Sequence, residues 1–160
     1  MIRHYHPKDE ADLRSCIHKL QEFESTINGL TAASEAMINP YLRELFRSNK
    51  ESGGQIFVKD IKGHVVGFVA VQVGIPSDEI HEVKYDYAYI SELVIMPAFR
   101  GIGYGKQLLE AAEQYARDHS TSILRIGSLA LNHTARVMYQ KSGFEEHAVL
   151  FQKILSCDAG

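Results

Sequence analysis

The chain is poor in cysteine, which limits the classes of protein it can belong to. Its two cysteines, Cys16 and Cys157, lie far apart in a sequence of 160 residues. They have neither the number of a disulfide framework nor the spacing of metal ligands. The eight histidines form no His-x-His or His-Glu-x-x-His pattern. We therefore expect two reduced thiols and no metal site.

An excess of one charge sign and long apolar runs are also missing. The formal net charge is -3 and there is no long Lys/Arg cluster. This argues against nucleic acid or an anionic membrane as the main partner. No apolar stretch is long enough to span a bilayer, and residues 1–6 are too polar to begin a secretory signal. We expect a cytoplasmic protein.

What the chain does have is enough apolar content for a core. Its hydrophobic fraction is 45%, and its length is close to that of one globular domain. We find no internal repeat and no low-complexity segment. We therefore expect a single domain over residues 1–160, in which residues 156–160 form a frayed tail.

Hydrophobic periodicity predicts a mixed α/β chain. Apolar residues at helical spacing predict helices over 7–28, 34–50, 103–119 and 134–141. Runs rich in β-formers between turn residues predict strands over 2–5, 55–59, 64–73, 83–95, 123–129 and 146–155. Pro40 should kink or split its helix. The alternation of Tyr85, Tyr87 and Tyr89 is interrupted further along the same strand, which predicts a bulge or a change to full burial.

A glycine-rich segment between strand 83–95 and helix 103–119 is the most informative part of the sequence. It consists of Arg100, Gly101, Ile102, Gly103, Tyr104, Gly105 and Lys106. Alternate glycines let several backbone N–H groups point at one spot, at a helix N-terminus that attracts anions. The spacing fits neither a P-loop nor a dinucleotide fingerprint, which needs a glycine in place of Lys106. We predict a phosphate or pyrophosphate cradle.

This segment resembles the acyl-coenzyme A loop of the GCN5-related N-acetyltransferases (GNAT), whose signature is Arg or Gln, two residues, Gly, one residue, then Gly or Ala. The preceding Leu93-Val94-Ile95-Met96-Pro97 and the later segment Asn132 to Phe144 resemble the same family in order and spacing. The resemblance implies a three-layer α/β fold. Its centre is a twisted, splayed mixed sheet of six or seven strands, with about four helices, two on each side.

The resemblance also implies an activity and a cofactor. The activity is the direct transfer of an acetyl group from acetyl-CoA to a primary amine of a small molecule or peptide. The pantetheine arm pairs with the main chain of Leu93, Val94 and Ile95, and an N–H of Leu93 or Val94 points at the thioester oxygen. Arg100 and Lys106 join the loop amides in contacting the pyrophosphate.

Three further residues receive roles from the resemblance. Asn132 meets the pantetheine arm or caps the following helix, and the two roles are compatible. Tyr139 lies near the sulfur and returns a proton to the thiolate, with a packing tyrosine as the alternative. Glu92 is the candidate base, although a structural or substrate-orienting carboxylate fits equally well and some family members use only ordered water. By parity, Glu92 should share a face with Ile90 and Val94.

Two other functions stay open at this point. One is a catalytically silent acyl-CoA-binding or regulatory module that uses the same loop. The other is a transferase for a longer donor, such as succinyl- or propionyl-CoA. No covalent nucleophile is expected, because neither cysteine adjoins the glycines or a paired histidine. The sequence selects no particular amine, and a homodimer is compatible with it.

Overall fold

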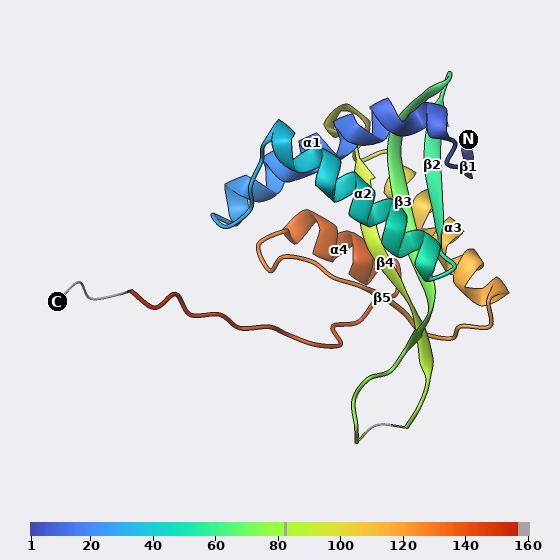
Figure 1. The fold of residues 1–160 in the computed structure, drawn as a ribbon, viewed down its shortest axis with the longest axis vertical. Coiled ribbons are helices and arrows are strands. Elements are labelled where there is room, and N and C mark those ends of the chain that lie inside the picture. Colours follow the sequence, from blue (N-terminus) through green and yellow to red (C-terminus); the bar gives the residue numbers. More distant parts are fainter. Residues whose placement is uncertain (82, 157–160) are drawn as a thin grey trace.

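The computed structural model describes residues 1–81 and 83–156, and within these ranges it contains five strands and four α-helices (Figure 1). The strands are β1 (Ile2–His4), β2 (Gln55–Ile61), β3 (His64–Pro76), β4 (Asp86–Ile95) and β5 (Leu124–Ile126). The helices are α1 (Glu10–Ile27), α2 (Glu35–Glu51), α3 (Tyr104–Asp118) and α4 (His133–Lys141). Short 3-10 turns, η1 (Pro7–Asp9) and η2 (Pro97–Phe99), precede α1 and α3.

The strands form one mixed sheet in the order β1-β2-β3-β4-β5. Neighbours from β1 to β4 pair antiparallel, and β5 pairs parallel to β4. A parallel pair needs a long crossover connection, which α3 provides. Figure 1 shows α1 and α2 crossing one face of the sheet and α3 lying behind it.

Two apolar clusters fill the space between the sheet and its helices. The first joins Leu13 of α1 and Ile38 of α2 to Phe68 of β3. The second joins Leu108 of α3 to the sheet, and Met138 of α4 packs against it. The fold is therefore a three-layer α/β arrangement with two helices on each side, as predicted. α2 runs unbroken from Glu35 to Glu51, so Pro40 does not split it.

β4 carries the bulge that the interrupted alternation predicts. Ala70 of β3 lies opposite Glu92, whereas the next residue, Val71, lies opposite Ile90. Ser91 is thus an extra residue in β4. β5 pairs with β4 only before the bulge, ending at Ile90. Beyond it, β4 has no neighbouring strand on the β5 side among the described residues, and the two strands splay apart.

The prediction of six or seven strands is wrong for residues 1–81 and 83–156, which form five. The difference is the expected strand over 146–155, where the structure has no regular secondary structure. Strand residues need a neighbouring edge for their backbone hydrogen bonds, and this segment leaves the body of the protein (Figure 1). Cys157 and most of the tail expected over 156–160 lie outside the described residues.

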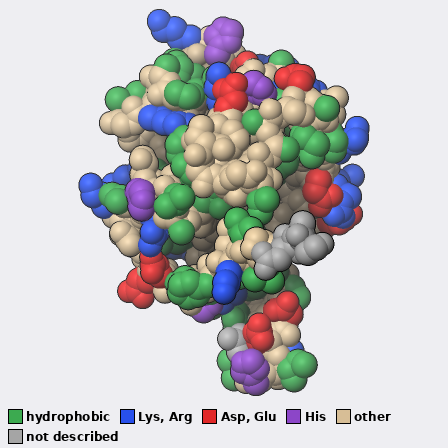
Figure 2. Space-filling view, turned by 90° about the vertical axis from the view of Figure 1, so that its left-hand side faces the viewer, with side chains coloured by type: hydrophobic (Ala, Val, Ile, Leu, Met, Phe, Trp, Pro, Cys, Tyr) green, Lys and Arg blue, Asp and Glu red, His purple; other side chains and the backbone are tan. Residues whose placement is uncertain are grey.

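Two surface properties bear on the expected partners. No helix in the described part of the chain combines the length and apolar character needed to cross a bilayer. On the face shown in Figure 2, Lys and Arg side chains are scattered rather than gathered into a patch.

Candidate active site

The divergence of β4 from β5 opens a cavity of about 280 Å³. Glu92 and Leu93 of β4 line it, together with Glu24 of α1 and, from the α4 region, Asn132 and Tyr139. Four residues predicted from the sequence as functional therefore meet in one cavity. The glycine-rich segment does not line this cavity; it follows β4 and leads into α3.

The bulge decides which way Glu92 faces. Ile90 belongs to the apolar cluster under α3, whereas Val94 belongs to the cluster under α1 and α2. An extra residue at Ser91 reverses the side-chain alternation, so the prediction that Glu92 shares a face with both Ile90 and Val94 is wrong. Glu92 lies on the α1 and α2 side with Val94, where Tyr41 reaches it.

Glu92 is enclosed and lies near a second carboxylate. Burial, and secondarily the negative charge of Glu24, raise the pKa of Glu92 to about 8. Burial also raises the pKa of Glu24. The hydroxyl of Tyr41, on α2, donates a hydrogen bond to the Glu92 carboxylate. A carboxyl group whose pKa lies near neutrality can accept and release protons at physiological pH.

Tyr139 is a half-buried titratable residue that also lines the cavity. Burial, and secondarily the charges of Glu92 and Glu24, raise its pKa to about 12. The phenol is therefore fully protonated at neutral pH. Its ring packs 5.9 Å from the ring of Phe144. Among the described residues its hydroxyl has no hydrogen-bond partner, so it is free to donate to a ligand.

Asn132 has the capping role that was one of its two expected functions. Its Oδ1 accepts a hydrogen bond from the N–H of Ala135 at 3.2 Å and so caps α4. The same residue lines the cavity. Its position is thus compatible with contact to a ligand through the remaining amide group.

The free edge of β4 has a defined set of exposed backbone groups. The N–H of Met96 donates to a carbonyl of β3, whereas the carbonyl of Ile95 accepts a bond from Arg100 Nε, at 2.9 Å in each case. Backbone groups of successive residues in a strand point to opposite sides. Leu93 therefore shares the outward orientation of Ile95, while Val94 faces β3. Of the two expected oxyanion donors, Leu93 is the one on the open side.

The glycine segment has the geometry of an anion site. Gly101 and Gly103 have φ values of +78° and +89°, and a Cβ at either would meet no atom within 4 Å. The space before them is open, and their left-handed backbone favours glycine. α3 begins at Tyr104 without a side-chain cap, which leaves its first amides available. Gly105 has a packing role, since a Cβ there would lie 2.7 Å from Met138 Sδ.

The cations near this segment are not locked in buried ion pairs. Arg100 lies with its guanidinium carbon 5.7 Å from the ring centre of Phe23. Lys106 is 69% exposed, and its Nζ lies 3.8 Å from a carboxylate oxygen of Glu110. Ile102, between the two left-handed glycines, is exposed. Both cations can therefore turn towards an anion at the N-terminus of α3.

Three residues of this region were missed by the sequence analysis: Glu24, Tyr41 and Lys59. Glu24 follows Leu20 by one helical turn, so a carboxylate on the buried stripe of α1 was a usable signal. Tyr41 offered no such signal. Lys59 is buried on β2, where its Nζ lies 2.6 Å from Gln107 Oε1 and 4.2 Å from the ring centre of Tyr104. It adds a positive charge beside the first turn of α3.

Curated proteins with similar sequences are named N-acetyltransferases. The uncharacterized N-acetyltransferase MJ1207 of Methanocaldococcus jannaschii is 32% identical over 111 residues, which are 69% of this chain and 46% of that protein. The matched parts of two such curated relatives, this one included, span 46% and 44% of their lengths.

Solved structures show the same fold. A single-site mutant of the BH1408 protein from Bacillus halodurans has a TM-score of 0.88 and 17% identity, covering 98% of this chain and 99% of that one. The protein AAC(6')-Iy, in complex with the bisubstrate analog CoA-S-monomethyl-acetylneamine, has a TM-score of 0.72 and 15% identity, with 98% of both chains covered. The model of the acetyltransferase (GNAT) family matches residues 18–144. This chain therefore belongs to the GNAT family.

Proposed function

We propose that this protein is an N-acetyltransferase that transfers the acetyl group of acetyl-CoA directly to a primary amine of a small molecule or peptide. The observation that supports this most is the cavity at the β4–β5 splay. There an enclosed carboxylate, Glu92, and an enclosed phenol, Tyr139, lie beside the open backbone edge of β4. Acyl transfer needs a base, an acid and an oxyanion donor, and this cavity offers one of each.

Acetyl-CoA fits the residues present. The first amides of α3, with Gly101 and Gly103 before them, would hold the diphosphate. The outward backbone groups of Leu93 and Ile95 would pair with the pantetheine arm. Arg100 now donates to the Ile95 carbonyl, so it would move from that acceptor to the phosphates when the arm binds. When bound, acetyl-CoA supplies the activated acyl group as a thioester.

The chemical step follows from the position of each group. Glu92, as a carboxylate, takes a proton from the acceptor ammonium, directly or through water, and leaves a neutral amine. The amine nitrogen attacks the thioester carbon, and the N–H of Leu93 stabilises the oxyanion. The carbon–sulfur bond then breaks, and the Tyr139 hydroxyl donates its proton to the thiolate. The attacking nitrogen, which after the attack carries one proton more than the amide product, releases that proton to water. Solvent exchange returns both side chains to their starting states.

The charge of the cavity favours a cationic acceptor. Two carboxylates, Glu24 and Glu92, line it, and neither is paired with Lys or Arg among the described residues. An ammonium group between them would relieve their mutual repulsion. AAC(6')-Iy, which shares the fold, is named an aminoglycoside N-acetyltransferase and was solved with the bisubstrate analog CoA-S-monomethyl-acetylneamine. This agrees with an amine acceptor without identifying it.

A thiol-release assay tests the proposal. The purified protein would be incubated with acetyl-CoA and a panel of primary amines and peptides, with CoA release and acetylated product both measured. We expect acetylation of at least one primary amine. A protein that binds acetyl-CoA by calorimetry but releases no thiol with any acceptor would be a silent binding module. Faster turnover of succinyl- or propionyl-CoA would contradict the assignment of the donor.

A further inference from the structure

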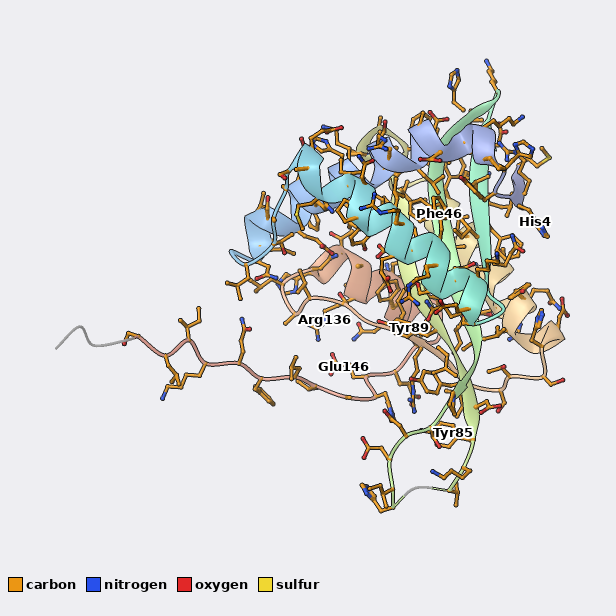
Figure 3. The ribbon with its side chains drawn as sticks, viewed as in Figure 1. His4, Phe46, Tyr85, Tyr89, Arg136 and Glu146 are labelled. Atoms are coloured by element: carbon orange, nitrogen blue, oxygen red, sulfur yellow. The ribbon has the colours of Figure 1, made fainter. Side chains whose placement is uncertain are left out.

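Three tyrosines in and just before β4 form a row that starts at the cavity. Tyr89 lines the cavity, and Tyr87 lies two positions earlier on the same face of the strand. The ring centre of Tyr85 lies 6.4 Å from that of Tyr87. Figure 3 shows Tyr89 within the body of the protein and Tyr85 further out, where β3 and β4 extend beyond the helices. We call these three side chains the tyrosine row.

The tyrosine row lies on the same side of the sheet as Glu92. Ala88 and Ile90 alternate with the tyrosines along the strand and belong to the apolar cluster under α3. The tyrosines therefore face the α1 and α2 side. Neither apolar cluster of the described residues includes them, and each is half-buried. A ligand that enters the cavity on this side would pass across their rings.

Arg125 of β5 brings a positive charge to the tyrosine row. It lies opposite Tyr89 in the parallel register, so the two side chains project from the same face. The guanidinium carbon lies 4.3 Å from the ring centre of Tyr87 and 5.5 Å from that of Tyr85. Its Nη2 donates a hydrogen bond of 2.7 Å to the Tyr85 hydroxyl. These contacts hold the guanidinium over the outer part of the row.

The charge of Arg125 is not neutralised within the described part of the chain. Arg125 takes part in none of the ion pairs that residues 1–81 and 83–156 form. Asp86 lies between Tyr85 and Tyr87 in the sequence and therefore projects from the opposite face. A guanidinium has several N–H donors besides the one bound to Tyr85, so it can still hold a carboxylate through two parallel hydrogen bonds.

The tyrosine row thus has opposite charges at its two ends. Glu24 and Glu92 line the inner end, and Arg125 lies over the outer end. Glu92 follows Tyr87 by five positions, of which one is the extra residue of the bulge. About four strand steps of 3.3 Å, or roughly 13 Å, therefore separate them. An extended peptide of about four residues covers the same distance.

We propose that the acceptor is a short acidic peptide whose amino group enters the cavity and whose carboxylate, about four residues along the peptide, binds Arg125. The tyrosine row supports the extended peptide between these two contacts. The proposal rests on the proposed function, because the amine lies beside Glu92 only if the cavity is the site of acetyl transfer. It makes Arg125 the residue that selects among primary amines.

Matched acceptor peptides test the proposal. The amides of Ala-Ala-Ala-Glu and Ala-Ala-Ala-Gln differ only in the charge of the fourth residue. We expect kcat/KM of the wild type to be at least about tenfold higher for the acidic peptide, since a hydrogen-bonded ion pair is gained. Most of the difference should lie in KM, because the contact is remote from the reacting atoms. Equal kcat/KM values for the two peptides would overturn the proposal.

Variants of Arg125 show whether its charge carries the preference. Arg125→Gln should remove the preference for the acidic peptide, and Arg125→Glu should reverse it in favour of the amide of Ala-Ala-Ala-Lys. Tyr85→Phe removes the hydrogen bond to Arg125 but keeps the charge, so it should retain most of the preference. Arg117→Gln is the matched control, because Arg117 is an exposed arginine of α3 that pairs with Glu113.

Two results with these variants would contradict the role of Arg125. One is a preference that survives Arg125→Gln. The other is a preference that disappears equally in Tyr85→Phe, which would mean that Arg125 acts only by holding the tyrosines in place. Thermal melts would verify that each variant folds, and the comparison of the two peptides on the wild type needs no variant.

Calorimetry separates the choice of acceptor from the proposed activity. Titration of each peptide into the protein with CoA present measures affinity without a chemical step. Tighter binding of the acidic peptide by a protein that acetylates no peptide would support the role of Arg125 and contradict the proposed activity. Acetylation of other amines, together with binding of neither peptide, would overturn the role of Arg125 while the proposed activity stands.

Discussion

Tyr41 donates its hydroxyl hydrogen to the carboxylate of Glu92, and this bond connects α2 to the bulged part of β4. The two residues are 51 positions apart in the sequence. The contact forms because the extra residue at Ser91 turns Glu92 towards the α1 and α2 layer. A hydrogen bond donated to a carboxylate stabilises its ionised form, so Tyr41 partly offsets the effect of burial on the pKa of Glu92.

Tyr41→Phe should therefore move the pH dependence of turnover upward. The proposed base must be ionised, so kcat/KM of the wild type should rise with pH to a plateau above about 8, where Glu92 titrates. Removing the donated bond should raise this apparent pKa by roughly one unit. Tyr115→Phe is the control, since the Tyr115 hydroxyl bonds to the Gly53 carbonyl away from the cavity. An unchanged pH profile of kcat/KM in Tyr41→Phe would show that the hydrogen bond from Tyr41 to Glu92 does not influence catalysis.

Glu92→Gln should change how stability depends on pH. The raised folded-state pKa means that, between the ordinary glutamate pKa and about 8, the folded protein holds a proton that the unfolded chain releases. Wild-type stability should thus fall as pH rises through this window. A neutral glutamine removes that loss and should stabilise the protein at pH 8 by roughly 3 kcal/mol, after allowance for relaxation around the charge. Melting temperatures of the wild type and of Glu92→Gln, measured at pH 5 and pH 8, would test this. The same change in melting temperature between the two pH values in both proteins would contradict the prediction.

Glu24→Gln should shift the activity profile in the opposite direction from Tyr41→Phe. The Glu24 charge contributes to the raised pKa of Glu92, so its removal should lower the apparent pKa of turnover. It should also raise KM for a cationic amine, because one of the two carboxylates of the cavity is lost. Glu22→Gln is the matched control, since Glu22 is exposed and pairs with Lys19. Equal profiles for the two variants would exclude an electrostatic role for Glu24.

Much of the fold could be predicted because its signals are local. The apolar stripe of α3 and the two left-handed glycines before it require only neighbouring residues. The interrupted side-chain alternation in β4 is likewise a local signal, and it predicts the bulge that the structure shows. The β-forming residues of segment 146–155 predict a strand for the same local reason. Pairing depends on which edge is within reach, and local sequence does not contain that information.

The candidate site was predictable where the main chain or a motif defines it. Leu93, Asn132 and Tyr139 could be predicted because the order and spacing of their segments resemble the family. All three line the cavity. The side of the sheet on which Glu92 lies could not be predicted, because the extra residue at Ser91 reverses the side-chain alternation of β4. Tyr41 approaches from a helix far away in sequence, and such contacts follow from packing alone.

Tyr139→Phe should lower turnover far more than acetyl-CoA affinity. The phenol lines the cavity, and its hydroxyl has no partner among the described residues, so its loss leaves no internal bond broken. The remaining ring can keep its packing against Phe144. We expect kcat to fall by about a hundredfold, the usual contribution of a positioned acid, with an unchanged dissociation constant for acetyl-CoA. Turnover equal to that of the wild type would remove the acid role.

Gly103→Leu should weaken acetyl-CoA binding strongly without unfolding the protein. Gly103 has a φ of +89° and open space before it, so a side chain would fill the position proposed for the diphosphate. Gly63, in the turn between β2 and β3, has a φ of +87° and equally open surroundings, which makes Gly63→Leu a matched control. Both variants should lose about 1–2 kcal/mol from left-handed strain. Calorimetry should show that Gly63→Leu keeps its affinity while Gly103→Leu loses at least about tenfold, because only one of the two glycines precedes a free helix N-terminus. Equal affinities would place the diphosphate elsewhere.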